Sequence, residues 1–183
     1  MDALVLAGGI PQVGDALFQE TSGNPKAMLD ICGKPMIQWV VDALDAAEMI
    51  DKIFIVGLPA TDLLRSSKLR EFLPNQKDMI DNIRGGVEVI QKSDPNVMHV
   101  ALVSSDIPAV LPEQIDWVVR TSEETDHDIY YNVVKREVME KRFPGSKRSY
   151  VHLKDMDVCG GDLNVIRASL VSRSDELWDK IIA

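Results

Sequence analysis

Continuous runs of apolar residues, rather than alternating ones, mark three segments in the first two thirds of the chain. They cover residues 3–7, 52–57 and 100–103, and a glycine or a polar cluster ends each run. A short apolar run without polar alternation is typical of a strand buried on both faces, as in a parallel sheet. We therefore expect three such strands.

Between and after these runs, apolar residues recur at spacings of three and four, which is typical of amphipathic helices. The pattern predicts helices from Pro35 onward and over 62–72, 79–90 and 112–122. Pro35 and Pro112 suit a first helical turn. Alternation of strand and helix predicts an α/β fold with a Rossmann-like, doubly wound and mostly parallel sheet.

The pattern changes after residue 126. Apolar and polar residues alternate more regularly over residues 128–134 and 149–153, which favours strands there. A further strand is expected within residues 158–166. The pattern in this half of the chain predicts a mixed β extension of the sheet, which could form a lid or a platform for an acceptor. A last helix over 175–182 has no C-cap signal, which leaves a C-terminal truncation or a covering partner open.

Charge and cysteine content narrow the classes of protein. The formal net charge is −9, which opposes binding to nucleic acid or to an anionic membrane. No apolar run approaches the ~20 residues that cross a bilayer, and no basic leader opens the chain. Cys32 and Cys159 lie far apart, and we expect two reduced thiols in a cytoplasmic protein.

A glycine loop and a lysine form the first candidate site. Gly8 and Gly9 follow the first strand, where open α/β sheets bind ligands and where glycine lets the backbone approach a phosphate. Lys26 closes the long loop that starts there and could reach triphosphate oxygens. The alternatives are a tight turn and a solvated surface lysine.

Two acidic segments supply candidate metal ligands. Asp106 follows the third buried strand, and Asp162 follows Gly160-Gly161. Carboxylate oxygen is the ligand that Mg²⁺ prefers. A strand-exit turn at Asp106 and a β-bulge or hairpin at 160–162 are the structural alternatives.

Four segments, in this order, resemble the MobA-like NTP transferase family of nucleotidyltransferases. They are Leu6-Ala7-Gly8-Gly9, residues 25–29 (PKAML), residues 33–37 (GKPMI) and residues 102–108 (LVSSDIP). The resemblance implies a nucleotide-diphospho-sugar transferase-like fold. It also implies one domain over 1–183, with a nucleotide-binding half over 1–125 and an acceptor or lid half over 126–183.

The resemblance also assigns roles to residues. Ala7, Gly8 and Gly9 would wrap the triphosphate and the base, and Lys26 would stabilise the α-phosphate. Asp106 would bind Mg²⁺. Two further assignments rest on looser matches. Asp162 would be the second metal ligand, with Asn164 as the second choice for that role. Asn82 and Gly86 would hold the base.

The implied reaction is the Mg²⁺-dependent transfer of an NMP group from an NTP to a small phosphorylated acceptor, with release of pyrophosphate. CTP and GTP are the favoured nucleotides. A homo-oligomer is left open. Arg148 and Tyr150, with Lys147 and Lys154, could hold the acceptor phosphate, or could form a solvated face.

The chain departs from the family in one respect. The family loop usually carries an arginine for the β- and γ-phosphates, and residues 8–15 (GGIPQVGD) have none. Lys34, Lys147 or Arg148 could replace it. A rival interpretation is a nucleotide-binding or regulatory module that kept the fold and lost catalysis.

Overall fold

The computed structural model describes residues 1–76, 78–146 and 148–171. Its centre is a six-stranded sheet in the order β5-β4-β1-β6-β11-β7. Strands β5, β4, β1 and β6 are parallel, whereas β11 runs antiparallel to β6 and β7. The strands are β1 Asp2–Leu6, β4 Ile53–Val56, β5 Leu69–Leu73, β6 His99–Ser104, β7 Ile129–Tyr130 and β11 Leu163–Arg167.

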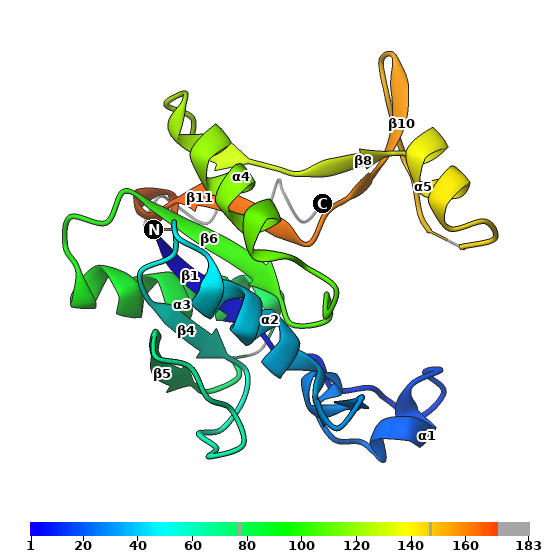
Figure 1. The fold of residues 1–183 in the computed structure, drawn as a ribbon, viewed down its shortest axis with the longest axis horizontal. Coiled ribbons are helices and arrows are strands. Elements are labelled where there is room, and N and C mark those ends of the chain that lie inside the picture. Colours follow the sequence, from blue (N-terminus) through cyan, green and yellow to red (C-terminus); the bar gives the residue numbers. More distant parts are fainter. Residues whose placement is uncertain (77, 147, 172–183) are drawn as a thin grey trace.

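Helices cover both faces of this sheet (Figure 1). On one face, α2 (Met36–Ala46) and α4 (Pro112–Glu123) share a core with Ala3 and Val5. On the other face, α3 (Met79–Ser93) and the short η2 helix (Ala168–Leu170) share a core with Leu4. Successive side chains of β1 point to opposite faces, so one apolar run supplies both cores. The Rossmann-like, doubly wound fold predicted from the sequence is confirmed.

A smaller antiparallel sheet projects from the body (Figure 1), and we call residues 133–160 the arm. Its strand order is β8-β10-β9, with α5 beside it. The sequence predicts one strand within 158–166, but the structure divides this segment between two sheets, with a turn at Gly161-Asp162. The elements are β8 Val133–Lys135, α5 Arg136–Arg142, β9 Val151–Leu153 and β10 Met156–Gly160.

The helix predicted over 62–72 is wrong. Residues 69–73 form β5, which pairs in parallel with β4 at the edge of the main sheet. Arg70 and Glu71 are exposed there, so charged and apolar positions mix in a way that resembles an amphipathic helix. The hydroxyl of Ser66 donates to the Asp45 carboxylate and fixes the preceding turn against α2.

The long loop after β1 leaves the body and returns to it. It contains the short helices α1 (Phe18–Thr21) and η1 (Lys26–Met28), followed by the hairpin of β2 (Asp30–Ile31) and β3 (Lys34–Pro35). The backbone N–H of Lys26 donates to the Gly9 carbonyl at 3.0 Å and closes the loop. The predicted helix at 175–182 lies outside the described residues. None of the described helices is long and apolar enough to span a membrane.

Candidate functional site

The carboxyl ends of β1 and β6 lie side by side at the point where the strand order reverses. β4 lies on one side of β1 and β6 on the other, and Leu6 pairs with Ser104. The loops that follow these two strands therefore leave the sheet side by side, and they lead to α2 and α4 on the same face. Open α/β sheets bind ligands in the crevice that such a switch point creates.

An ion pair joins these two loops. Lys26 Nζ lies 2.6 Å from Asp106 Oδ2. The two side chains are 34% and 31% exposed, so both remain within reach of a ligand. A Cβ atom on Gly9 would lie 2.7 Å from Lys26 Cε, so glycine at this position leaves room for the lysine side chain. The structure thus brings Gly9, Lys26 and Asp106 together.

Ser104 fixes the Asp106 carboxylate, a contact that the sequence analysis missed. Its Oγ donates to Asp106 Oδ1 at 2.5 Å, which leaves Oδ2 for Lys26. Partial burial alone would raise the pKa of Asp106, but the hydrogen bonds from Lys26 and Ser104 outweigh burial and hold that pKa below its ordinary value. Asp106 is therefore a carboxylate at neutral pH.

Asp162 lies on the neighbouring strand end. Its backbone carbonyl accepts the Ser104 N–H at 2.8 Å, and its exposed side chain lines the same cavity as Asp106. Asn164 braces the turn instead, because its Oδ1 accepts from Asn132 N and its Nδ2 donates to the Gly161 carbonyl.

This donor set suits Mg²⁺ held together with a nucleotide. Among the described residues no three Asp, Glu, His or Cys side chains gather into a metal site. Mg²⁺ usually takes only one or two carboxylates and completes its octahedron with phosphate oxygens and waters. Asp106 and Asp162, on one cavity wall, fit that requirement.

Gly8 borders a small amide network on the other side of β1. Asn82 Nδ2 donates to Asn75 Oδ1 at 2.9 Å, and Asn82 Oδ1 accepts from Gln76 N. A Cβ atom on Gly8 would lie 2.3 Å from Asn75 Oδ1. The structure therefore places Asn82 and Asn75 beside the glycine loop, and the role of Asn82 in holding a base stays a prediction.

Two other expected nucleotide contacts have packing roles. Ala7 is buried and its N–H donates to the Val56 carbonyl. Gly86 lies where α3 crosses β1, and a Cβ atom there would lie 2.4 Å from Leu4 Cδ2. Gly86 thus lets the helix approach the sheet, and its role in holding a base stays a prediction.

The basic residues expected to replace the family arginine make other contacts. Lys34 Nζ pairs with the Asp42 carboxylate and lies 3.5 Å from the centroid of the Trp39 ring. Arg148 Nη2 donates to the Gly160 carbonyl at 3.2 Å. Lys147 lies outside the described residues. Lys26 is therefore the basic residue that the described geometry brings to the crevice.

Each residue of the ion pair lines a cavity of its own. One, of about 390 Å³, has Gly9, Asp15 and Lys26 in its wall. The other, of about 680 Å³, lies between α4 and the arm and has Asp106 and Asp162 in its wall. The ion pair thus joins a cation in the wall of one cavity to a carboxylate in the wall of the other.

Comparison with known proteins identifies the family of this chain. Residues 3–172 match the MobA-like NTP transferase domain family. The chain belongs to this family. A probable molybdenum cofactor guanylyltransferase from Pyrococcus horikoshii is 27% identical to this MobA-like domain over 118 residues, which are 64% of the chain and 54% of that relative. The domain spans about half or less of the length of the curated relatives that it matches.

Solved structures confirm the fold of this MobA-like domain. A hypothetical transferase from Thermus thermophilus superposes with a TM-score of 0.77 at 26% identity, covering 99% of this chain and 71% of that one. The 2-C-methyl-D-erythritol 4-phosphate cytidylyltransferase of Francisella tularensis superposes at 0.63 with 13% identity, covering 99% and 79%. The predicted nucleotide-diphospho-sugar transferase-like architecture is confirmed.

Proposed function

We propose that this MobA-like domain transfers an NMP group from an NTP to a small phosphorylated acceptor in a Mg²⁺-dependent reaction that releases pyrophosphate. The observation that carries the proposal is the Lys26–Asp106 pair, which joins the walls of two cavities. CTP and GTP are the first candidates, since named relatives and structural neighbours are guanylyl- and cytidylyltransferases. The free cysteines Cys32 and Cys159 support a cytoplasmic setting.

The glycine loop and Lys26 would hold the nucleotide. Backbone N–H groups around Gly8 and Gly9 approach the phosphates without a side chain in between. Lys26 would exchange Asp106 for an α-phosphate oxygen and neutralise the charge that develops on phosphorus. Asp106 and Asp162 would hold Mg²⁺, which offsets phosphate charge when bound.

The chemical step needs little covalent help from the protein. An acceptor phosphate oxygen forms a bond to the α-phosphorus, the bond to the β-phosphate oxygen breaks, and pyrophosphate leaves with that electron pair. The acceptor phosphate is already ionised at neutral pH, so no general base is required. Positioning by the two cavities and charge neutralisation by Lys26 would carry the rate.

Pyrophosphate release tests the proposal. The full chain is assayed with each NTP, Mg²⁺ and a panel of phosphomonoesters, and Asp106→Ala is assayed alongside. We expect release of pyrophosphate that depends on Mg²⁺, on one NTP and on an acceptor. We expect the substitution Asp106→Ala to abolish this release. Near-normal release by Asp106→Ala would remove this residue from the site.

One observation favours the rival function of a nucleotide-binding regulatory module. The loop arginine is missing, and neither Lys34 nor Arg148, as placed here, replaces it. A single lost charge contact costs about 1.5–3 kcal/mol. Saturable NTP binding without release of pyrophosphate from the NTP, whichever acceptor of the panel is present, would support the rival.

A further inference from the structure

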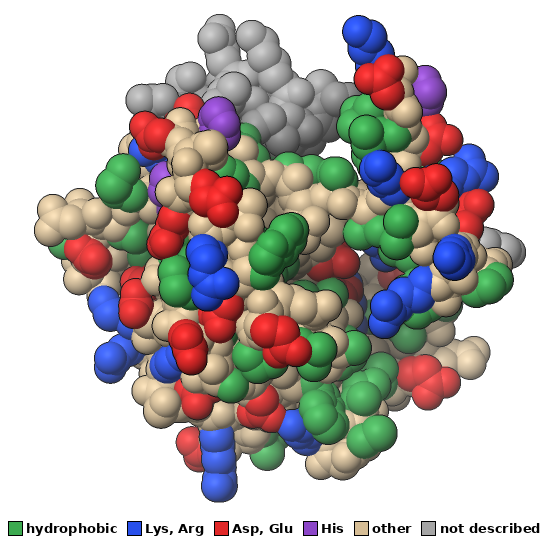
Figure 2. Space-filling view, turned by 45° about the horizontal axis from the view of Figure 1, so that its top comes forward, with side chains coloured by type: hydrophobic (Ala, Val, Ile, Leu, Met, Phe, Trp, Pro, Cys, Tyr) green, Lys and Arg blue, Asp and Glu red, His purple; other side chains and the backbone are tan. Residues whose placement is uncertain are grey.

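The larger cavity lies between α4 and the arm, and Figure 2 shows the hollow between the body and the arm. If the proposed function holds, this is where the acceptor binds, because Asp106 and Asp162 belong to its wall. The chemistry of the remaining wall then defines what the acceptor must be.

Two aromatic side chains in this wall are strongly exposed. Trp117 on α4 is 60% exposed, and Phe143 at the end of α5 is 53% exposed. Covering solvated aromatic rings with an apolar or flat ligand lowers the free energy of the complex. Further apolar residues complete the wall, namely Ile107, Pro108, Val110, Val118, Val134 and Leu163.

The charged residues of the wall are all acidic. Among the described residues they are Asp106, Glu113 and Asp162, and no described Lys, Arg or His lines the cavity. Two arginines approach from outside the lining: Arg142 lies 5.7 Å from the Phe143 ring centroid, and Arg148 binds the Gly160 carbonyl. Lys26 pairs with Asp106 from outside the lining as well, but in the proposed reaction Lys26 and Mg²⁺ serve the reacting phosphates. A second negative charge inside the cavity would then face acidic side chains without a cation of its own, which is costly.

We propose that the acceptor has an apolar, flat body that packs on Trp117 and Phe143, and that its reacting phosphate is its only negative charge. Polyol phosphates fit less well, because Gln114 and Asn132 are the only side-chain amides among the described residues of the wall. Phosphorylated acids fit worst, because their carboxylate would meet the acidic wall.

Binding to the full chain with Mg²⁺ and no nucleotide tests this directly, by ligand-observed NMR or calorimetry. Phenyl phosphate and 1-naphthyl phosphate enlarge the apolar body at constant charge, whereas glycerol 3-phosphate and 3-phosphoglycerate are the polyol and acidic probes. We expect 1-naphthyl phosphate to bind most tightly, phenyl phosphate next and 3-phosphoglycerate most weakly.

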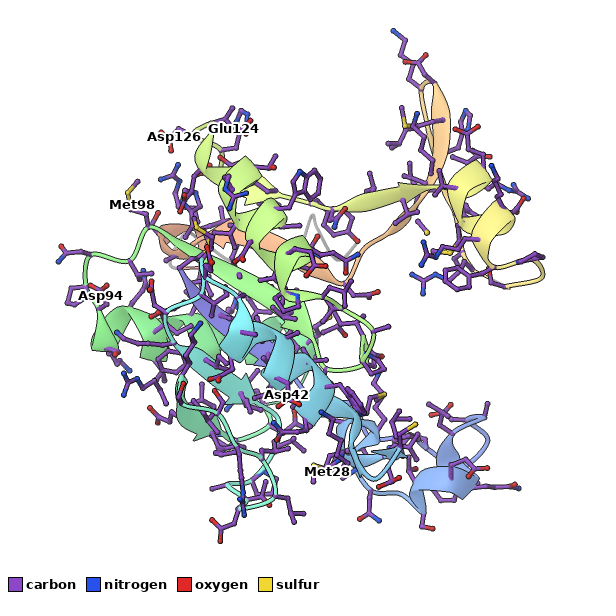
Figure 3. The ribbon with its side chains drawn as sticks, viewed as in Figure 1. Met28, Asp42, Asp94, Met98, Glu124 and Asp126 are labelled. Atoms are coloured by element: carbon purple, nitrogen blue, oxygen red, sulfur yellow. The ribbon has the colours of Figure 1, made fainter. Side chains whose placement is uncertain are left out.

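Variants locate the effect in the cavity. Trp117→Ala should weaken 1-naphthyl phosphate roughly tenfold and leave glycerol 3-phosphate unchanged. Met98→Ala is the matched control, because Met98 is also 60% exposed but lies away from the arm (Figure 3). It should change neither affinity.

Three results would each overturn the acceptor proposal: equal or tighter binding of the polyol or the acid, an aryl affinity that Trp117→Ala does not change, and no binding of any probe. None of them bears on transfer itself, which pyrophosphate release measures separately. Mg²⁺-dependent release with a polyol phosphate as the best acceptor would keep the reaction and reject the acceptor class.

Discussion

Lys26 Nζ and Asp106 Oδ2 lie 2.6 Å apart although 80 residues separate them in the sequence. One belongs to the loop after β1 and the other to the loop after β6, and the parallel pairing of those strands brings them together. Without substrates each neutralises the other. In the proposed reaction Lys26 would turn to the α-phosphate and Asp106 to Mg²⁺.

Replacing Lys26 should affect turnover more than folding. Lys26→Ala removes the cation assigned to the α-phosphate, and the loss of one such stabilising group typically lowers turnover roughly 10²–10³-fold. Lys34→Ala is the matched control, because Lys34 pairs with Asp42 outside the crevice. Steady-state pyrophosphate release and circular dichroism compare the two, and equal losses in both variants would contradict the assignment.

Ser104 should set the acid limb of the pH profile. Ser104→Ala removes a hydrogen bond that lowers the pKa of Asp106, so that pKa should rise toward its ordinary value. The acid limb of Mg²⁺-dependent turnover should then move to higher pH, while Ser104→Thr should restore the wild-type limb. An unchanged limb in Ser104→Ala would show that Asp106 does not control it.

The same lowered pKa predicts how stability depends on pH. Because Asp106 has a lower pKa folded than unfolded, its contribution is complete above the unfolded value and is lost as pH falls through the folded value. Asp106→Asn should therefore remove part of the acid-induced loss of stability. Denaturant titrations at neutral and acidic pH measure it, and parallel curves for both proteins would contradict the prediction.

Neighbouring glycines of α3 separate packing from nucleotide binding. A Cβ on Gly86 would lie 2.4 Å from Leu4, so Gly86→Ala should destabilise the fold by about 1–3 kcal/mol. Gly85→Ala, whose nearest contact is 3.8 Å from the new Cβ, should stabilise it by up to ~1 kcal/mol. Denaturant midpoints measure both, and lower NTP affinity in Gly86→Ala at full stability would favour a base-holding role.

Asp162 should control the requirement for Mg²⁺. Asp162→Ala removes one of the two proposed carboxylate ligands and should raise the Mg²⁺ concentration for half-maximal turnover at least tenfold. The reason is that loss of a residue that only supports a metal ligand already lowers metal affinity about 10–100-fold. Asp157→Ala on the arm, where Asp157 contacts His152, is the control. An unchanged Mg²⁺ requirement in Asp162→Ala would leave Asp106 as the sole protein ligand.

Much of the fold can be predicted because the central strands are buried on both faces. Residues 3–7 and 100–103 contain almost no polar residue, and few structures other than a central parallel strand accept that pattern. The edge strand β5 was missed because one side of it faces solvent, so its pattern resembles a helix. The arm strands are short, and their pairing depends on contacts that local sequence does not encode.

The site could be predicted where a strand exit carries the chemistry. Gly9, Lys26 and Asp106 all follow from their positions after buried strands. Asn75 was missed because residues 62–72 were interpreted as a helix; once β5 is recognised, Pro74-Asn75 becomes another strand exit at the same edge. Ser104 was missed because no spacing rule reveals which side chain will hold a carboxylate.

Transfer of an α-phosphate label tests the central claim most directly. The full chain is incubated with Mg²⁺, an acceptor phosphomonoester and an NTP labelled at the α-phosphate, and the products are separated. We expect label to enter an acceptor–NMP product in one-to-one ratio with pyrophosphate, and we expect Lys26→Ala and Asp106→Ala each to suppress both products. Label recovered only in NTP or free NMP with every acceptor, or transfer that survives both substitutions, would contradict it.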